Sequence, residues 1–276
     1  MTGNTEHDEQ QSGRHRLDTG VRRRRVLIAG GGIAVAGGLA VAGMASADPA
    51  QGTAEASTTD ATADTTTAAI TGVCVLNAEV TEGPYSLEGA LVRADIREGK
   101  EGFEVRYTFT VVDIANDCAP LANALVEIWH CDHLGEYSGF VGGNGHQEED
   151  NGTFLRGGRM TDENGQCEIT SIWPGHYVSR AVHVHMRLHT DVTLTDDSYT
   201  GGDIIHTGQL FFDPDINTEI QATSPYSENT TKETQLEDDG IYDDGGSSSG
   251  LLTLTALGDS VADGYKATLT VGVSTA

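Results

Sequence analysis

The feature that most limits the folds open to this chain is a hydrophobic period of two. In residues 104–113 and again in residues 265–273, apolar side chains occupy every second position and polar side chains fill the positions between. Successive side chains of a β-strand point to opposite faces of its sheet, so both segments predict half-buried strands. The further segments that we predict as strands are residues 124–131, 167–172, 181–189, 208–212 and 251–257.

No helical period of any length and no internal repeat accompanies these segments. Turn signals such as Glu163-Asn164-Gly165 and Pro174-Gly175 separate several of them. The sequence therefore predicts an all-β fold, a two-sheet β-sandwich. Long irregular loops are expected at residues 139–153 and 190–207, and loops of that length usually carry function or are disordered.

The first 47 residues have the pattern of an export signal. Arginines at residues 22–25 precede an uncharged stretch, residues 26–47, which ends in Ala45-Ser46-Ala47, a small-x-small pattern that a signal peptidase accepts. The consecutive arginines and the weak hydrophobicity suit the twin-arginine route. An uncleaved membrane anchor is the alternative, and the glycines of the stretch disfavour it. We expect residues 1–47 to be a signal peptide and the protein to be secreted.

Residues 48–70 differ in composition from the rest of the chain beyond the signal. They contain seven threonines, seven alanines and one large aliphatic residue, Ile70, so they cannot bury a core and predict a disordered linker. The globular domain is then expected over residues 71–276.

Charge excludes two classes of partner. The chain has 16 Lys+Arg against 42 Asp+Glu, a formal net charge of −26. Such a surface repels nucleic acid and anionic lipid, so we expect no nucleic-acid partner and no membrane association after signal cleavage. The oligomeric state stays open.

Cysteine usage agrees with export. Cys74, Cys118, Cys131 and Cys167 make an even number with no C-x-x-C pair, which is compatible with two disulfides and unlike a zinc motif. Cys74 precedes the first core strands and Cys118 follows the strand at 104–113, so we predict that they pair. Cys131 and Cys167 are either a second pair or two buried thiols.

The predicted strand at residues 181–189 carries the most chemical information. Valine, methionine and leucine at 182, 184, 186 and 188 form one face, and His183, His185, Arg187 and His189 form the other. Imidazoles at positions i and i+2 project side by side and can bind one metal ion. An exposed polar sheet face would produce the same pattern.

Two tyrosines lie in turns beside predicted strands. Tyr177 follows Pro174-Gly175 and enters the histidine strand, and Tyr137 follows the turn after the strand that ends at Cys131. Either tyrosine alone would be read as a packing residue.

Taken together, these residues resemble the intradiol ring-cleavage dioxygenases, specifically their secreted branch. The motifs that carry the resemblance, in chain order, are Thr81-Glu82-Gly83-Pro84-Tyr85, Leu91-Val92-Arg93-Ala94-Asp95-Ile96-Arg97-Glu98-Gly99, Asn123-Ala124-Leu125-Val126-Glu127-Ile128-Trp129-His130-Cys131, Gly135-Glu136-Tyr137-Ser138-Gly139-Phe140, Phe154-Leu155-Arg156-Gly157, Pro174-Gly175-His176-Tyr177, His183-Val184-His185 and Thr207-Gly208-Gln209-Leu210-Phe211-Phe212. So many motifs in one order over about 200 residues are far more specific than any one of them.

The resemblance implies a mononuclear, non-haem Fe³⁺ site and a set of residue roles. The metal ligands would be Tyr137, Tyr177, His183 and His185. Phenolates are hard anionic donors that favour the ferric state. The substrates would be a catechol-type aromatic diol and O₂, cleaved between the hydroxylated carbons to a cis,cis-muconate-type product. The resemblance thus implies that residues 71–276 are a catalytic domain.

Four further roles come from the same resemblance. Tyr177 would leave the metal and take a proton during the reaction, and Arg180 would stabilise negative charge on the substrate. Tyr85 and Gln209 would lie at the substrate. Arg156 and Arg159 flank a Gly-Gly pair that reads as a turn, and they could equally pair with surface acids.

The chain departs from the family pattern beside a predicted ligand. The secreted branch usually has Pro-Gly-Trp-Tyr-Pro-Gly-Arg, where this chain has Pro174-Gly175-His176-Tyr177-Val178-Ser179-Arg180, and Ser86 stands where an aromatic often follows Pro-Tyr. These changes leave substrate preference and rate open.

Two other functions fit parts of the sequence. His183, His185 and His189 on one strand face could form a His₃ zinc site, which would leave both tyrosines without a role. A secreted β-sandwich on a linker could also be a binding module with little or no activity.

Overall fold

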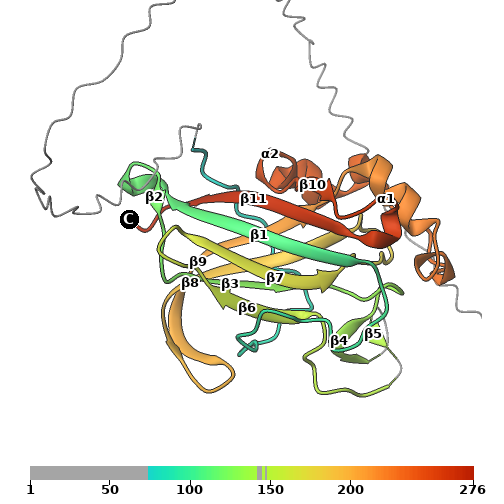
Figure 1. The fold of residues 1–276 in the computed structure, drawn as a ribbon, viewed down its shortest axis with the longest axis horizontal. Helices are drawn as coiled ribbons and strands as arrows, with labels where there is room; N and C mark the ends of the chain where they lie inside the picture. Colours follow the sequence, from blue (N-terminus) through green and yellow to red (C-terminus); the bar gives the residue numbers. More distant parts are fainter. Residues whose placement is uncertain (1–73, 142–144, 147) are drawn as a thin grey trace, which may run out of the picture. The chain divides into compact units, whose positions relative to one another are not determined.

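The computed structural model describes residues 74–141, 145–146 and 148–276. The predicted signal peptide 1–47 and linker 48–70 lie outside the described residues. Two sheets form the body of the domain, and helical turns from the last third of the chain lie along one side (Figure 1). The predicted two-sheet β-sandwich is confirmed.

The first sheet has the order β10-β11-β1-β2, and β7 also pairs with β1. The second sheet has the order β6-β3-β8-β9, and β4 and β5 form a separate small ribbon. The strands are β1 (Glu104–Asp113), β2 (Ala119–Pro120), β3 (Leu125–Trp129), β4 (Tyr137–Val141), β5 (Gly145–His146), β6 (Arg156–Met160), β7 (Gln166–Ile172), β8 (His183–Leu194), β9 (Tyr199–Phe211), β10 (Thr253–Ala256) and β11 (Tyr265–Val273).

Helical elements are short. They are α1 (Pro214–Gln221), α2 (Ser247–Ser249), 3₁₀ helices at Ile114–Asn116, Tyr226–Glu228, Leu236–Asp238 and Val261–Asp263, and a wide helical turn at Tyr242–Gly246. No helix in the described part of the chain is both long and apolar enough to cross a membrane.

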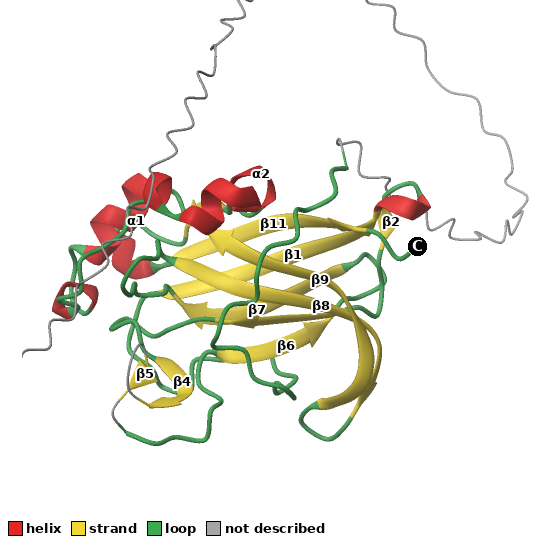
Figure 2. Ribbon diagram, turned by 180° about the vertical axis from the view of Figure 1, so that it is seen from behind, coloured by secondary structure: helices red, strands yellow, loops and turns green. Residues whose placement is uncertain are grey.

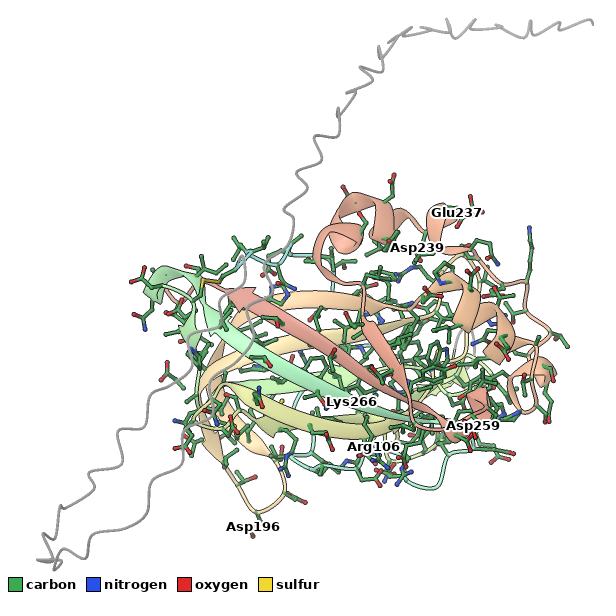
Figure 3. All side chains as sticks on the ribbon, turned by 45° about the horizontal axis from the view of Figure 1, so that its top comes forward. Arg106, Asp196, Glu237, Asp239, Asp259 and Lys266 are labelled. Atoms are coloured by element: carbon green, nitrogen blue, oxygen red, sulfur yellow. A yellow bond between two sulfur atoms is a disulfide. The ribbon has the colours of Figure 1, made fainter. Side chains whose placement is uncertain are left out.

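The core lies where the period of two predicts it. The apolar face of β1, with Tyr107 and Phe109 fully buried, meets the apolar face of β8, with Val184 and Met186 buried. The strand β11 pairs with β1 in parallel, from Val105↔Tyr265 to Asp113↔Val273. The polar side of the first sheet faces outwards, where Arg106 and Lys266 are labelled in Figure 3.

The predicted loop at 190–207 is wrong. Residues 183–211 form one long antiparallel hairpin, in which β8 and β9 pair out to Leu194↔Tyr199. Its end projects from the sandwich, and Asp196 lies at the tip (Figure 3). Backbone hydrogen bonds pair the two strands of this arm, and the bond from Val92 N–H to the carbonyl oxygen of Asp197 ties it to the segment before β1. Most of its positions are exposed, so it carries no hydrophobic alternation that would predict strands. The loop predicted at 139–153 is likewise strand in part, at β4 and β5.

The expectation of no helix also missed α1. Asp213 caps this helix by accepting hydrogen bonds from the backbone N–H groups of Asp215 and Ile216, and Pro214 stands at its first position. With eight residues, the helix is too short for a clear 3.6-residue period.

The cysteine predictions are settled by the described residues. Cys74 and Cys118 form a disulfide that joins the start of the described chain to the turn after β1. Cys131 and Cys167 are unpaired and buried. Cys167 lies in β7 of the first sheet, whereas Cys131 follows β3 of the second sheet, so the buried-thiol interpretation holds.

Candidate metal centre

The histidine face of β8 is buried, so the interpretation of an exposed polar face is wrong. His183 is 2% exposed and His185 is 0% exposed. A loop crosses the outer face of the second sheet (Figure 2), and its backbone bonds, from Val80 N to Thr207 O and from Gly158 N to Leu91 O, identify it as the segment that precedes β1. This segment covers β8 and β9 and encloses the polar side chains beneath it.

Close backbone packing brings the two tyrosine loops together. Gly135, with φ +88°, lies so near the next loop that a Cβ would stand 2.3 Å from the carbonyl oxygen of His176. Gly175, in the second loop, lies equally close to the first, since a Cβ there would stand 2.5 Å from the carbonyl oxygen of Asp132. Only glycine fits at either place. The two loops therefore lie against each other and direct Tyr137 and Tyr177 to the same point.

A buried carboxylate shapes the first of these loops. Asp132 accepts hydrogen bonds from the backbone N–H groups of Leu134 and Glu136, at 3.0 and 3.1 Å. Its other oxygen lies 2.8 Å from Lys100 Nζ. This arrangement fixes the turn from which Tyr137 enters β4.

Four side chains meet at one point. Tyr177 Oη lies 3.1 Å from His183 Nε2, His183 Nε2 lies 3.1 Å from His185 Nε2, and His185 Nε2 lies 3.0 Å from Tyr137 Oη. The four residues predicted as ligands thus converge through the atoms that would bind a metal.

Hydrogen bonding and burial keep His183 in the form that can bind a cation. His183 Nδ1 lies 2.7 Å from the carbonyl oxygen of Ala181, which can only accept, so Nδ1 carries the proton and Nε2 presents its lone pair. Burial, and then the charge of Arg180, lower the pKa of His183 to about 3, which keeps the imidazole in its neutral, ligating form.

The two tyrosines are also suited to bind a cation, because their phenols are buried. Burial raises the pKa of Tyr177 to about 12 and raises the pKa of Tyr137 well above its usual value of 10.0. The phenols therefore ionise only if a cation replaces their protons. Two neutral imidazoles and two ionisable phenols form a donor set that suits one hard metal ion.

Stacking fixes the ring of His185. Metal-binding histidines usually donate their second nitrogen to an acceptor, but His185 Nδ1 has no hydrogen-bond partner among the described residues. Instead, the ring lies parallel to Trp129, with centroids 5.0 Å apart and an angle of 6°. The Arg187 guanidinium carbon lies 5.1 Å from the centroid of the same indole.

Arg180 reaches the cluster from the loop before β8. Its Nη1 lies 3.3 Å from His183 Nε2, and Nη2 donates to Gln209 Oε1. Its Nε donates to Asp239 at 2.9 Å. Gln209 in turn donates from Nε2 to the carbonyl oxygen of Thr81 at 2.7 Å. The structure thus brings Arg180 and Gln209 together, and Asp239 is a partner that the sequence interpretation missed.

Tyr85 packs on the predicted ligands. Its ring stacks on Tyr137 with centroids 4.4 Å apart, and it meets Tyr177 edge-on at 5.9 Å and Phe140 at 5.1 Å. Tyr85 is half-buried and forms a wall beside both phenols.

Arg156 corrects a sequence interpretation. It is 5% exposed and makes no surface pair, because it donates to the carbonyl oxygens of Tyr85 and Ser138 and to the Ser138 hydroxyl. The adjacent Gly-Gly pair is not a turn but lies within β6. A Cβ at Gly157 would stand 2.6 Å from Ile96, so the glycine permits close packing of the covering segment. Arg156 therefore ties Tyr85 to the strand of Tyr137.

The structure also accounts for the departures near Tyr177. His176 is buried and lies 2.9 Å from both Gln221 Oε1 and the carbonyl oxygen of Thr231, so it anchors the loop by polar contacts in place of an indole. Val178 is 61% exposed. Ser179 has φ +68°, a left-handed conformation, at the position where the family pattern has glycine.

We expect Ser179→Gly to stabilise the protein. A non-glycine residue in the left-handed region costs about 1–2 kcal/mol, part of which the greater freedom of glycine in the unfolded chain offsets, so we expect a net gain of roughly 0.5–1 kcal/mol. Urea unfolding of both proteins measures the gain. The control is Ser171→Gly, which removes a buried hydroxyl in β7 and should destabilise; an equal loss at residue 179 would contradict the prediction.

The His₃ zinc alternative finds no support here. His189 Nε2 lies 2.9 Å from Glu127 Oε2, so the third histidine is bound elsewhere. Within the described ranges, no three histidine, cysteine or carboxylate side chains form a cluster that could hold a metal ion.

The fold and the site together describe a β-sandwich with a buried cluster of two phenols and two imidazoles. A family model described as Dioxygenase matches residues 82–190. An intradiol ring-cleavage dioxygenase structure from Tetranychus urticae has 32% sequence identity and a TM-score of 0.63, with 73% of this chain and 95% of that chain covered. This chain belongs to the intradiol ring-cleavage dioxygenase family.

Curated relatives are more distant and longer. Catechol 1,2-dioxygenase of Acinetobacter baylyi is 30% identical over 156 residues, which are 45% of this chain and 48% of that protein. Catechol 1,2-dioxygenase 2 of Acinetobacter lwoffii is 28% identical over 151 residues, 44% of this chain and 52% of that protein. The chain thus spans about half the length of these relatives.

Proposed function

We propose that this protein is a secreted, ferric, non-haem dioxygenase that opens catechol-type aromatics between the hydroxylated carbons. The products would be cis,cis-muconate-type acids. The observation that carries the proposal is the convergence of four side chains, in which successive Oη and Nε2 atoms lie 3.0–3.1 Å apart, in the order Tyr177, His183, His185 and Tyr137. Family membership supports the reaction type, and the non-enzymatic and zinc alternatives have no comparable support.

The donor set supports the choice of Fe³⁺. Two phenolates neutralise much of a trivalent charge, and hard anionic oxygens favour the ferric over the ferrous state. Bound at these four residues, Fe³⁺ would withdraw electron density from a catecholate and make its ring reactive towards O₂.

Tyr137 and Tyr177 lie in different surroundings, which suit them to different roles. Tyr137 lies in β4, is 0% exposed and is covered by the ring of Tyr85, so it is suited to stay in place. Tyr177 lies on an irregular loop and is 7% exposed. Tyr177 is therefore the phenol that can move away and accept a proton at Oη from a substrate hydroxyl.

Arg180 would act on charge that develops in the reaction. Its guanidinium Nη1 lies 3.3 Å from His183 Nε2, and a guanidinium is a permanent cation. A fixed cation at this place stabilises negative charge on the substrate ring. Tyr85 would bound the substrate on one side, and Gln209 would hold the guanidinium.

The proposal includes export of the protein from the cell. The signal-like residues 1–47, the linker 48–70 and the Cys74–Cys118 disulfide are consistent with a protein that works outside the cell. Its partners would be a small aromatic diol and O₂. The net charge of −26 argues against nucleic acid and anionic membranes as partners.

The test is O₂ uptake with product mass determination across a panel of substituted catechols. We expect about one iron per chain, a red to brown colour, uptake without added reductant, and a muconate product. Guaiacol, in which one hydroxyl is methylated, is the matched control and should cause no uptake. A yellow semialdehyde formed only with ferrous iron, or a colourless protein inactive with every catechol, would refute the proposal.

A further inference from the structure

Arg180 is held by a carboxylate that no family motif in the sequence pointed to. Asp239 follows the 3₁₀ helix Leu236–Asp238, between α1 and α2, and is 0% exposed. In Figure 3, Glu237 points away from the domain, whereas Asp239 lies further in. The two residues therefore belong to different environments although they are neighbours in an acidic stretch.

Backbone groups fix the carboxylate of Asp239 from two sides. Oδ1 accepts from the N–H groups of Ile241 and Tyr242, at 2.9 and 3.0 Å. Oδ2 accepts from the N–H of Ala181 at 2.7 Å and from Arg180 Nε at 2.9 Å. The carboxylate thus joins its own segment to the point at which the chain enters β8.

The charges of the pair are complementary. Burial alone would raise the pKa of Asp239, but the hydrogen bond and charge of Arg180, together with the backbone donors, hold this pKa below its usual value. Asp239 is therefore an anion at neutral pH. The Arg180 side chain is only 17% exposed. Its Nη1 faces His183, and its Nη2 faces Gln209 and lies 3.5 Å from Asp239 Oδ1.

This geometry restricts the arginine. A guanidinium on a long side chain has several accessible rotamers, and a single hydrogen bond to Gln209 would not select one. The rigid carboxylate takes Nε, so the plane of the guanidinium is fixed, with Nη1 directed at the cluster and Nη2 at Gln209.

We propose that Asp239 is a positioning residue of the active site, which holds Arg180 in the orientation that stabilises negative charge on the substrate. The inference rests on the proposed function, because it needs a reaction in which that charge develops. It adds a residue from the C-terminal part of the chain, outside the 82–190 segment that matches the family model.

Two variants distinguish an effect on the orientation of Arg180 from an effect on the stability of the fold. Asp239→Asn keeps a hydrogen-bond acceptor for the backbone donors but removes the negative charge that holds Arg180. Asp113→Asn is the matched control, because Asp113 is also a buried carboxylate that accepts from backbone N–H and a hydroxyl, but beside Ala115 and Thr275 at the end of β1.

We expect Asp239→Asn to keep its iron and colour while kcat falls about 10- to 100-fold, since a misplacement of about 1 Å can cost 100-fold, with KM changed less. Asp113→Asn should leave kcat within about 2-fold of the parent. In an Arg180→Ala background, Asp239→Asn should cause less than about a 2-fold further loss, because residues that act as a unit are not additive.

A second readout does not depend on turnover. In the metal-free protein, the ¹⁵N–¹H resonance of Arg180 Nε should be protected from exchange, and the protection should be lost in Asp239→Asn. An equal loss of kcat with and without Arg180, or unchanged kcat alongside a lowered melting temperature, would overturn the inference. If the parent consumed no O₂ with any catechol, the proposed function would fail, whereas the resonance would still report the Arg180–Asp239 contact.

Discussion

On the proposed function, His185→Ala should bind no iron and be colourless. Its O₂ uptake should fall by more than the roughly 10- to 100-fold that loss of a supporting partner usually costs at a metal site. The reason is its place in the cluster, because His185 Nε2 lies between Tyr137 Oη and His183 Nε2 at 3.0 and 3.1 Å. Iron analysis and the visible spectrum measure the result, and circular dichroism checks the fold.

Two companion variants sharpen this test. Trp129→Leu leaves the proposed ligand His185 in place but removes the indole stacked on it, so iron affinity should fall by roughly 10- to 100-fold. His189→Gln changes a histidine on the same strand face that bonds Glu127 instead, and it should keep its iron and colour. A His189 variant that lost the metal, beside a His185 variant that kept it, would contradict the ligand set.

Glu127→Gln should lower the free energy of unfolding by up to about 3–5 kcal/mol, the cost of removing one member of a buried ion pair. The loss leaves Arg187 only its longer contacts with Glu82 and Glu88, at 3.5 and 3.4 Å. Glu127 and Arg187 are 3% and 1% exposed, and their Oε1 and Nη2 atoms lie 2.9 Å apart. Tyr199 and His189 bond the other carboxylate oxygen. Urea unfolding at neutral pH measures the loss.

The pH dependence of this stabilisation comes from the same contacts. Burial tends to raise the pKa of Glu127, but His189 and Arg187 hold it below its usual value of 4.5. The stabilisation is therefore present above pH 4.5 and is lost as the pH falls through the lowered folded-state pKa. Glu168→Gln, at an exposed position in β7, is the control and should change stability by less than about 0.5 kcal/mol. Equal effects of the two variants would refute this account.

The core strands were predictable because burial on one face leaves a period of two in the sequence. The strands β1 and β11 match their predicted bounds, and β8 was predicted with its correct inner face. The arm formed by residues 190–207 was not predicted because backbone pairing and polar contacts to the segment before β1 hold it while most of its side chains are exposed, so no alternation of apolar residues marks it. The helix α1 escaped because eight residues are too few to show a period.

The site was predictable where a motif defines it. Tyr137 and Tyr177 were singled out through the family resemblance, since nothing in their spacing places two tyrosines 40 positions apart beside one histidine pair. Asp239 could not be found in this way, because it stands among other acidic residues and only tertiary contacts distinguish it. Arg156 was misread because Gly157 and Gly158 suggested a turn, although they serve close packing.

The Cys74–Cys118 bridge also determines how a mechanical load applied at the predicted linker would pass through the domain. A pull from the N-terminal side reaches Cys74 and crosses the covalent bond to Cys118, so the chain between them carries no tension. That bypassed length contains β1, the strand that pairs with β11, β2 and β7. While the bridge is intact, a force applied from the N-terminal side does not pass through β1 and so does not pull it out of the sheet. After reduction, the same force would pass along the chain through β1.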